Sequence, residues 1–314
     1  MILDESRLHP VRVPLRHRFR DVVYREVVLI EGQTGWGEFS PFPEYPPNVA
    51  ARWLVAALEA ADGTWPAASK TSIHVNVTVP AVPAEAAFQI VEEAGCTTAK
   101  VKVAQWGQSF DDDVARVEAV RRALGPSGHL RLDANGAWSV GEAAVKLGEL
   151  SAFAIEYCEQ PVAGLDEMAK LRRQVDVPLA VDEPVRSGAT PEQLRAAADV
   201  LVLKAQPMGG VAPSIRLAEQ VGLPVVVSSA LETSIGLAAG LALAAALPDL
   251  PYACGLATAL LLAEDVVEDS LIPVGGEIAV RRPVPDPAIM HRLRSPDSDQ
   301  MLERLKAAAD LLKG

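Results

Sequence analysis

The stretch IEYCEQPVAGLDEMAKLRRQVDVPLAVDEP, residues 155–184, contains one complete strand–helix–strand unit. Ile155–Cys158 and Leu179–Val181 are short β-rich runs, and Asp166–Gln174 between them has its apolar residues at helical spacing. Two parallel strands need a crossover of this kind, because the chain must return to the same end of the sheet. The unit therefore predicts a parallel α/β arrangement, and each of its strands ends directly before a carboxylate.

The same alternation continues on both sides of this unit, with helical segments such as Asp111–Leu124, Gly141–Leu150 and Pro191–Ala198. The other β-rich runs are Ile73–Val79, Ala99–Val103, Leu130–Leu132, Val200–Leu203, Val225–Val227 and Tyr252–Gly255. Eight such runs predict a (β/α)8-type barrel, here of the (β/α)7β form, over residues 71–279. An open, doubly wound sheet is the structural alternative.

The first 70 residues have a different pattern. Val11–Leu15 and Val22–Ile30 are β-rich, and GQTGWGEFSPF (32–42) is a hairpin signal, so we expect a short antiparallel sheet. Val49–Ala61 is helical. These residues predict an N-terminal α+β capping domain, completed by part of the tail (about 280–314), whose helix Ser298–Leu312 could return to it.

Composition excludes several classes of protein. A net charge of −12 without any basic run argues against a nucleic-acid or anionic-membrane partner. The three cysteines are widely separated, which excludes a disulfide framework and fits a reducing compartment. No signal peptide is evident, and the longest apolar segment, 235–250, is too short to span a membrane and is better read as a buried helix. We therefore expect a cytoplasmic protein that acts on a small molecule, with its oligomeric state left open.

Six consecutive predicted strands end on a charged or hydroxyl side chain. The residues are Lys100 and Lys102, Asp133, Glu159, Asp182, Lys204, and Ser228 with Ser229. Any one of them alone could be a surface residue at a strand exit. In a barrel, however, chemistry takes place at the carboxyl ends of the strands, so all six positions would point into one mouth.

The three carboxylates Asp133, Glu159 and Asp182 form a set with oxygen donors only. Hard oxygen ligands without His or Cys select Mg²⁺, with Mn²⁺ as a possible substitute. Three carboxylates on neighbouring strands repel one another unless a cation lies between them. A structural salt-bridge cluster with the nearby lysines is the competing interpretation.

Lys102 and Lys204 lie on the second and sixth predicted strands, which are roughly opposite each other across a closed barrel. A nearby divalent cation, a second lysine and partial burial all disfavour the charged form of a lysine, so one of the two can act as a base near pH 7. A bound cation would also stabilise the charge formed when a proton is removed next to a carboxylate. The residues thus predict proton abstraction from a small carboxylate substrate.

The motifs KVK (100–102), DAN (133–135), EQP (159–161), DE (182–183) and KAQPMGG (204–210), in this order, resemble the muconate-lactonising subgroup of the enolase superfamily. The resemblance covers essentially the whole chain, including the GWGE turn, and the ordered set of motifs is highly specific. It implies that Lys102 is the base, that Lys204 stabilises the enediolate, and that the three carboxylates bind Mg²⁺.

The resemblance also implies substrate-binding roles. Lys100 would keep Lys102 deprotonated and contact the substrate carboxylate, Asn135 would support the metal shell or the base, and Ser228 and Ser229 would hold a second carboxylate. Loops of the capping domain would close the site; the candidates are Arg18, Phe19, Arg20 and the 36–45 turn.

Within the subgroup, segments such as GWGEFSPFPEY, VNVTVPAV and VVVSSALETSIG are similar to those of members that remove water from a hydroxylated cyclohexadiene carboxylate in menaquinone biosynthesis. The resemblance therefore implies syn dehydration. N-acylamino acid racemisation shares the first half of this reaction and stays open. The Asp-x-Asp signature of dipeptide epimerases is missing at Cys254–Thr258, and muconate cycloisomerisation is a further alternative. A non-catalytic barrel would be expected to have lost one of the five core residues, and none is lost.

Overall fold

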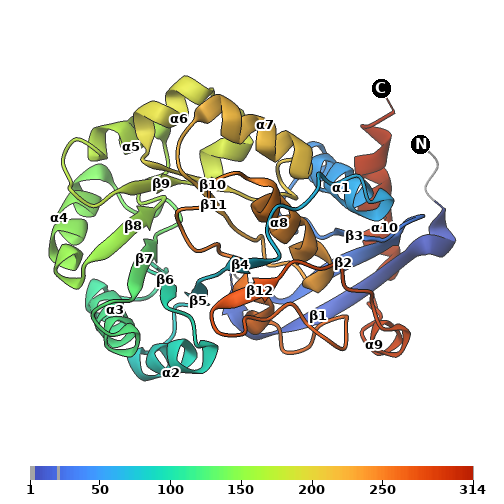
Figure 1. Ribbon diagram of the computed structural model, residues 1–314, viewed down its shortest axis with the longest axis horizontal. Helices are drawn as coiled ribbons and strands as arrows, with labels where there is room; N and C mark the ends of the chain where they lie inside the picture. The colour runs from blue at the N-terminus through green and yellow to red at the C-terminus, as the bar shows by residue number, and fades with distance from the viewer. Residues whose placement is uncertain (1–3, 20–21, 314) are drawn as a thin grey trace.

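The computed structural model describes residues 4–19 and 22–313, and its centre is a curled parallel sheet (Figure 1). The strand order is β11-β10-β9-β8-β7-β6-β5. The strands are β5 (Val77–Val79), β6 (Thr98–Lys102), β7 (His129–Asp133), β8 (Ile155–Glu159), β9 (Leu179–Val181), β10 (Val200–Leu203) and β11 (Val225–Val227). Single bridges from Cys254 to Val75 and from Gly255 to Ser228 close the gap between the two edges. The barrel is therefore of the (β/α)7β form, and the open-sheet alternative is wrong.

Two of the predicted strands differ from those observed. The run Ile73–Val79 is interrupted: β4 (Ser72–His74) pairs antiparallel with β12 (Glu277–Ala279). Val75 forms only the single bridge to Cys254, and the ladder with β6 begins at Val77. The run Tyr252–Gly255 forms isolated bridges rather than a ladder. Alternating apolar residues predict extended backbone, but they do not say which strand will be its partner.

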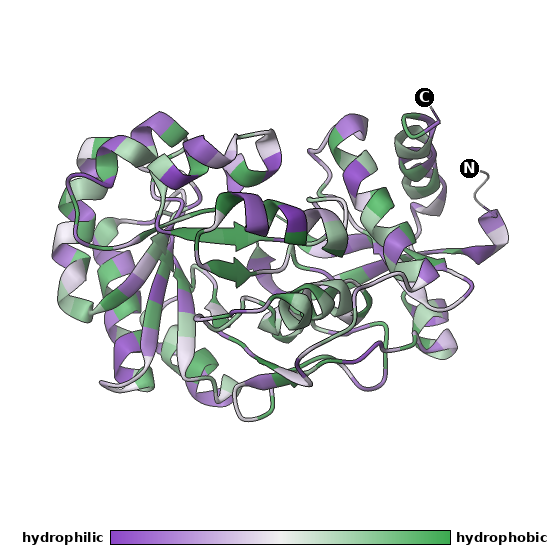
Figure 2. Ribbon diagram, turned by 45° about the horizontal axis from the view of Figure 1, so that its top comes forward, coloured by the Kyte–Doolittle hydropathy of each residue, from purple (hydrophilic) through white to green (hydrophobic). Residues whose placement is uncertain are grey.

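A helix follows each barrel strand and covers the outside of the sheet (Figure 1). These helices are α2 (Ala84–Ala94), α3 (Phe110–Leu124), α4 (Val140–Leu150), α5 (Leu165–Leu171), α6 (Pro191–Ala197), α7 (Val211–Val221) and α8 (Ser234–Ala246). The helices from α2 to α7 alternate polar and apolar patches in Figure 2, as expected for amphipathic helices. By contrast, every residue of α8 from Ser234 to Ala245 is buried, which confirms the predicted buried helix. Among the described residues, no helix is both long and apolar enough to cross a membrane.

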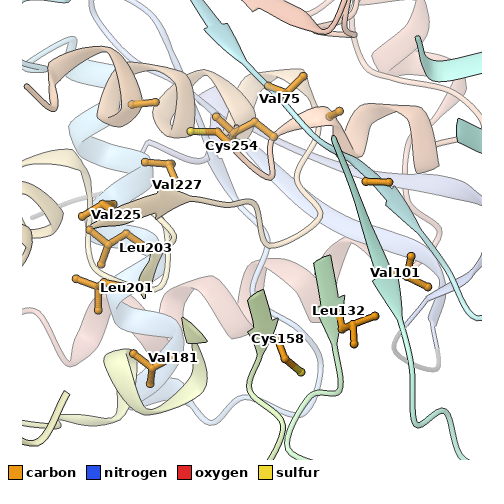
Figure 3. Close-up of a cluster of buried hydrophobic side chains, with 14 of the residues drawn as sticks. Val75, Val101, Leu132, Cys158, Val181, Leu201, Leu203, Val225, Val227 and Cys254 are labelled. Atoms are coloured by element: carbon orange, nitrogen blue, oxygen red, sulfur yellow. The ribbon is translucent and has the colours of Figure 1, made fainter. Parts of the chain in front are cut away.

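The outward faces of the barrel strands form the main hydrophobic core. Figure 3 shows Val101, Leu132, Cys158, Val181, Leu203 and Val227 in this core, together with four other labelled residues. Each of the six directly precedes a charged or hydroxyl residue at a strand end. Because successive side chains on a strand point to opposite faces, packing one residue against the helices turns the next one towards the barrel axis. Burial of each apolar side chain, worth about 1.5–3 kcal/mol, therefore also fixes the direction of a polar one.

The N-terminal part forms a three-stranded antiparallel sheet, β1 (Leu8–Phe19), β2 (Val22–Glu31) and β3 (Trp36–Phe39), followed by α1 (Pro47–Asp62). The C-terminal helix α10 (Ser298–Asp310) packs against α1, where Met301 and Leu305 join Trp53 in one apolar cluster. A short helix, α9 (Pro287–Arg292), precedes it. The exact limits of the two domains, near residues 70 and 280, stay predictions.

Glu59 of α1 connects this N-terminal part to the barrel. Its carboxylate accepts hydrogen bonds from the backbone N–H groups of Val211 (2.6 Å) and Ala212 (3.1 Å), at the beginning of α7. A negative charge is favourable at a helix N-terminus, where N–H groups lack partners within the helix. Gly210 makes the approach possible: it has a φ of +121°, and a Cβ there would lie 2.2 Å from Glu59 Oε2.

We expect Gly210→Ala to lower the free energy of unfolding by about 1–3 kcal/mol, because the new methyl group meets both backbone strain and the Glu59 carboxylate. Urea denaturation followed by circular dichroism measures the effect. Gly222→Ala is the matched control: its φ is +67°, but nothing lies within 4 Å of an added Cβ. Equal losses in the two variants would mean that contact with Glu59 contributes nothing.

Candidate active site

A cavity lies at the carboxyl ends of the barrel strands, beneath the N-terminal part of the chain. Barrel strands and the loops after them contribute Thr78, Lys100, Lys102, Asp133, Arg186, Lys204, Pro207, Ser228, Ser229, Ala230, Leu231 and Thr258 to its lining. The N-terminal part contributes Phe19, Phe42, Tyr45 and Trp53. The cavity thus combines several cations on its barrel side with four aromatic rings on the other.

The two lysines of β6 reach the carboxylates of the neighbouring strands. Lys102 Nζ lies 2.5 Å from Asp133 Oδ2, and Lys100 Nζ lies 3.2 Å from the same oxygen. Lys100 Nζ also lies 2.6 Å from Glu159 Oε2. Residues two apart on a strand share a face, so both lysines point to the interior, as predicted. The predicted strand-end positions of β6, β7 and β8 therefore do come together.

Asp182, which follows β9, is held from three sides. Lys204 Nζ lies 2.5 Å from its Oδ2, and Arg186 Nη1 lies 2.7 Å from its Oδ1. Its backbone N–H donates a hydrogen bond of 3.1 Å to the side chain of Gln160. This bond explains the glutamine of the EQP motif: Gln160, directly after β8, accepts from the backbone of Asp182, directly after β9, and so ties together the ends of two strands that bear carboxylates.

Burial and charge act against each other in this cluster. Burial raises the pKa of Asp133, but Lys102 and Lys100 lower it more, so that carboxyl is held well below its usual range. Burial lowers the pKa of Lys100, but Glu159 and Asp133 raise it more, so this ammonium stays charged. Burial and the charge of Asp133 raise the pKa of Glu159 to about 6. The cations around Glu159 therefore compensate its burial less than those around Asp133 do.

Glu159 also carries an orphaned atom. Its Oε1 is buried and has no hydrogen-bond partner among the described residues. A buried, unpaired carboxylate oxygen is costly, because its desolvation is not offset. Nowhere in residues 4–19 and 22–313, which the structure describes, do three Asp, Glu, His or Cys side chains form a group that could hold a metal ion. Asp133 and Asp182 are instead turned towards lysines.

Three other predicted residues lie around this cluster. Asn135 is exposed, and its Oδ1 accepts a hydrogen bond of 2.6 Å from Lys102 Nζ. Ser228 is buried at the cavity wall. The hydroxyl of Ser229 lies 2.5 Å from that of Thr258 and accepts a hydrogen bond from Leu231 N–H.

The predicted lid residues are partly in place. The ring of Phe19 lies 5.5 Å from Lys102 Nζ, and Phe42 and Tyr45 of the 36–45 turn line the cavity. Arg18 borders a neighbouring hollow together with Phe19 and Trp106. Arg20 lies outside the described residues.

Sequence reasoning missed Arg186, Thr78 and Thr258. Arg186 lies four residues after Asp182 in a short 3-10 helix, Glu183–Ser187, so the spacing within DEPVR was an available signal. No such signal in the sequence marks Thr258 and Thr78, because nothing local distinguishes them from other threonines in or near a strand.

Comparison with known proteins identifies the family. Residues 11–61 match the family described as enolase N-terminal domain-like, and residues 83–286 match the one described as enolase C-terminal domain-like. The o-succinylbenzoate synthase of Thermobifida fusca is 59% identical over 86% of this chain and 86% of its own length. That of Mycobacterium marinum is 50% identical over 98% of this chain and 94% of its own length. The chain belongs to the o-succinylbenzoate synthase family of the enolase superfamily.

Solved structures show how widely the fold of this family is shared. A muconate lactonizing enzyme from Pseudomonas fluorescens has a TM-score of 0.78 at 20% identity, over 92% of this chain and 98% of its own. The L-Ala-D/L-Glu epimerase from Bacillus subtilis has a TM-score of 0.75 at 23% identity, over 88% of this chain and 96% of its own. At this level of identity the likeness concerns the fold alone. The o-succinylbenzoate synthase family is therefore distinguished by its sequence, not by its architecture.

Proposed function

We propose that the chain dehydrates 2-succinyl-6-hydroxy-2,4-cyclohexadiene-1-carboxylate to 2-succinylbenzoate, an o-succinylbenzoate synthase reaction of menaquinone biosynthesis, with Lys102 as the base. The observation that carries the proposal is one buried cluster in a chain of this family. Lys100, Lys102, Lys204 and Asp133 line a single cavity, and these lysines form ion pairs with carboxylates at the ends of three successive strands. Three free, buried cysteines suit a reducing compartment, so we place the reaction in the cytoplasm.

Superfamily membership implies a divalent metal ion, and we propose that it is Mg²⁺, held by Asp133, Glu159 and Asp182. The donors fit, since all are carboxylate oxygens and each residue is at most 2% exposed. The unpaired Glu159 Oε1 needs a cationic partner. The charges of Asp133 and Asp182 both raise the pKa of Glu159, which supports the view that the three carboxylates are close enough to share one ion. Asp133 and Asp182 would have to turn from their lysines. A bound cation would neutralise charge developing on the substrate carboxylate.

Lys102 can serve as both base and acid. Its Nζ is held by Asp133 and Asn135 and lies at the cavity surface, beside Phe19. We propose that it removes the proton next to the ring carboxylate and then returns it to the leaving hydroxyl on the same face. Because elimination makes the ring aromatic, proton removal is the difficult step. The charged Lys100 next to it disfavours a second ammonium, whereas the ion pair with Asp133 favours one. Lys102 would therefore become a base once Asp133 has turned from it to the cation.

Other cations and hydroxyls bind the substrate in this proposal. Lys204 lies 2.5 Å from Asp182 and lines the same cavity, where its charge stabilises the enediolate. Ser228 and Ser229 line the wall beneath the capping domain and hold the distal succinyl carboxylate. The aromatic side chains above them exclude water from the ring.

The test is a substrate panel with purified protein. We expect Mg²⁺-dependent conversion of the cyclohexadiene acid to 2-succinylbenzoate, followed by ultraviolet absorbance, with kcat/KM far above that for any N-acylamino acid. Samples without enzyme and with a metal chelator give the background. A higher kcat/KM for an N-acylamino acid would mean that dehydration is not the main activity.

Racemisation of N-acylamino acids is the second candidate, because Lys102 and Lys204 both line the cavity. A lysine opposite the base could return a proton to the other face of the α-carbon. We expect this as a side activity at most. Incorporation of deuterium from D₂O at the α-carbon of an N-succinylamino acid measures it.

A further inference from the structure

The loop after β11 is part of the cavity wall and is held in a strained conformation. Its residues Ser228–Leu231 all line the cavity. Leu231 has a φ of +65°, in the left-handed region that is unfavourable for a branched side chain. Such a conformation persists only when the surroundings impose it. Local bonds from Leu231 N–H to Ser229 Oγ and from Ala230 N–H to Glu232 Oε2 hold part of the loop, and a further contact comes from the capping domain.

Arg25 of β2 makes this contact. Its side chain is 1% exposed, and its Nε donates a hydrogen bond of 3.0 Å to the carbonyl of Leu231. The same guanidinium bonds to the carbonyl of Ser40 and lies 4.0 Å above the ring of Phe42. Arg25 therefore joins the strained residue directly to the turn that covers the cavity.

Glu38, in the GWGE turn, holds the next residues of the loop. Its buried carboxylate accepts hydrogen bonds from Thr233 N–H (3.1 Å), Thr233 Oγ1 (2.5 Å) and Gly236 N–H (3.0 Å), which form the first turn of α8. Ser40 Oγ donates a further bond of 2.6 Å. A carboxylate of the capping domain thus caps a helix of the barrel, two residues beyond Leu231.

Glu59 offers an internal comparison. It also comes from the capping domain and also accepts backbone N–H groups at a helix N-terminus, but its helix is α7 and it contacts no residue of the 228–231 loop by a hydrogen bond among the described residues. Among the described residues, neither glutamate bonds to residues 228–231 themselves, but Glu38 holds Thr233, two residues after Leu231, whereas Glu59 holds only the start of α7.

We propose that Arg25 and Glu38 are positioning residues that hold the 228–231 loop in its substrate-binding conformation, so that docking of the capping domain and substrate affinity are coupled. Glu59 contributes to docking alone. The proposal rests on the proposed function in that Ser228 and Ser229 bind substrate, but the state of the loop can be measured without any substrate.

The first measurement is hydrogen–deuterium exchange of the backbone, analysed by mass spectrometry over residues 226–236. We expect Glu38→Gln to accelerate exchange in this segment, because an amide cannot accept from all the donors that surround the carboxylate. Glu59→Gln should accelerate exchange at the start of α7 and leave residues 226–236 unchanged. Unchanged exchange in Glu38→Gln, or equal acceleration in both variants, would overturn the proposal.

The second measurement is steady-state kinetics with the cyclohexadiene acid. Glu38→Gln should raise KM roughly tenfold with kcat within about twofold, and Glu59→Gln should leave both near wild type. Combined with Ser229→Ala, Glu38→Gln should raise KM by less than the product of the two single effects, because both act through one loop. Independent effects on KM would contradict the coupling.

A third variant covers the case in which Glu38→Gln does not fold. Arg25→Lys keeps the charge but removes the Nε–H that bonds to Leu231, and it should show the same acceleration over residues 226–236 and the same rise in KM. A wild-type protein inactive on the cyclohexadiene acid would refute the proposed function, and the exchange experiment would still decide the positioning roles.

Discussion

Lys102→Ala should lower kcat for dehydration by about 10³–10⁴-fold or to below detection, while the protein stays folded. The magnitude lies at the upper end for loss of one acid–base group, because in this mechanism one nitrogen removes the proton and also delivers it. Folding should survive, because Asp133 keeps its ion pair with Lys100 at 3.2 Å. Stopped-flow or steady-state absorbance measures the rate, and circular dichroism with thermal denaturation measures the fold.

Two comparisons make the result specific to Lys102. Lys146→Ala, on the outer helix α4, removes a lysine that lies over the ring of Trp138 and does not line the cavity, so it should retain full activity. Addition of methylamine should partly restore the turnover of Lys102→Ala, because a small amine can enter the space left by the side chain. The same addition should not raise the turnover of the wild-type protein. Full activity in Lys102→Ala would rule out the assigned base.

The strand-end residues could be predicted from the sequence because two regular features coincide. Parallel strands all end at one mouth, and alternation along each strand turns the residue after an outward-packed Val, Leu or Cys to the inside. Lys102, Asp133 and Glu159 follow Val101, Leu132 and Cys158 in this way. The contacts agree, since Lys102 pairs with Asp133 and Lys100, on the same strand face, pairs with Glu159. Their positions were predictable; their catalytic roles stay predictions until they are measured.

What could not be predicted depends on contacts between distant segments or on loop conformation. Glu38 bonds to Thr233, 195 residues further on, and no local pattern indicates such a partner. Arg186 reaches Asp182 only because a short 3-10 helix, Glu183–Ser187, follows β9. The break within the predicted strand at 73–79 has a similar origin: the buried side chain of Asn76 accepts a hydrogen bond from Arg131, where β4 leaves the barrel for β12.

Asp182→Asn should weaken Mg²⁺ binding by at least about 10–100-fold and abolish turnover at Mg²⁺ concentrations that saturate the wild type. The substitution keeps the shape of the side chain but removes one of three negative charges, and carboxylates bind Mg²⁺ largely through charge. The variant should still fold, since the amide oxygen can accept from Lys204 or Arg186. Isothermal titration calorimetry measures the affinity without any need for activity, and the rise in Tm on addition of Mg²⁺ provides a second readout.

Asp199→Asn is the matched control for Asp182→Asn. Asp199 also pairs with an arginine, Arg172, at 2.6 Å, but it bonds to Leu179 N–H at the opposite end of β9 from Asp182. Its substitution should lower stability slightly and leave Mg²⁺ affinity unchanged. If wild-type protein treated exhaustively with a chelator kept its turnover, or if Asp182→Asn bound Mg²⁺ as tightly as Asp199→Asn, the carboxylates would be a salt-bridge cluster. In that case the three lysines and Arg186 would have to stabilise the developing charge without a cation, and the orphaned oxygen of Glu159 would need another partner.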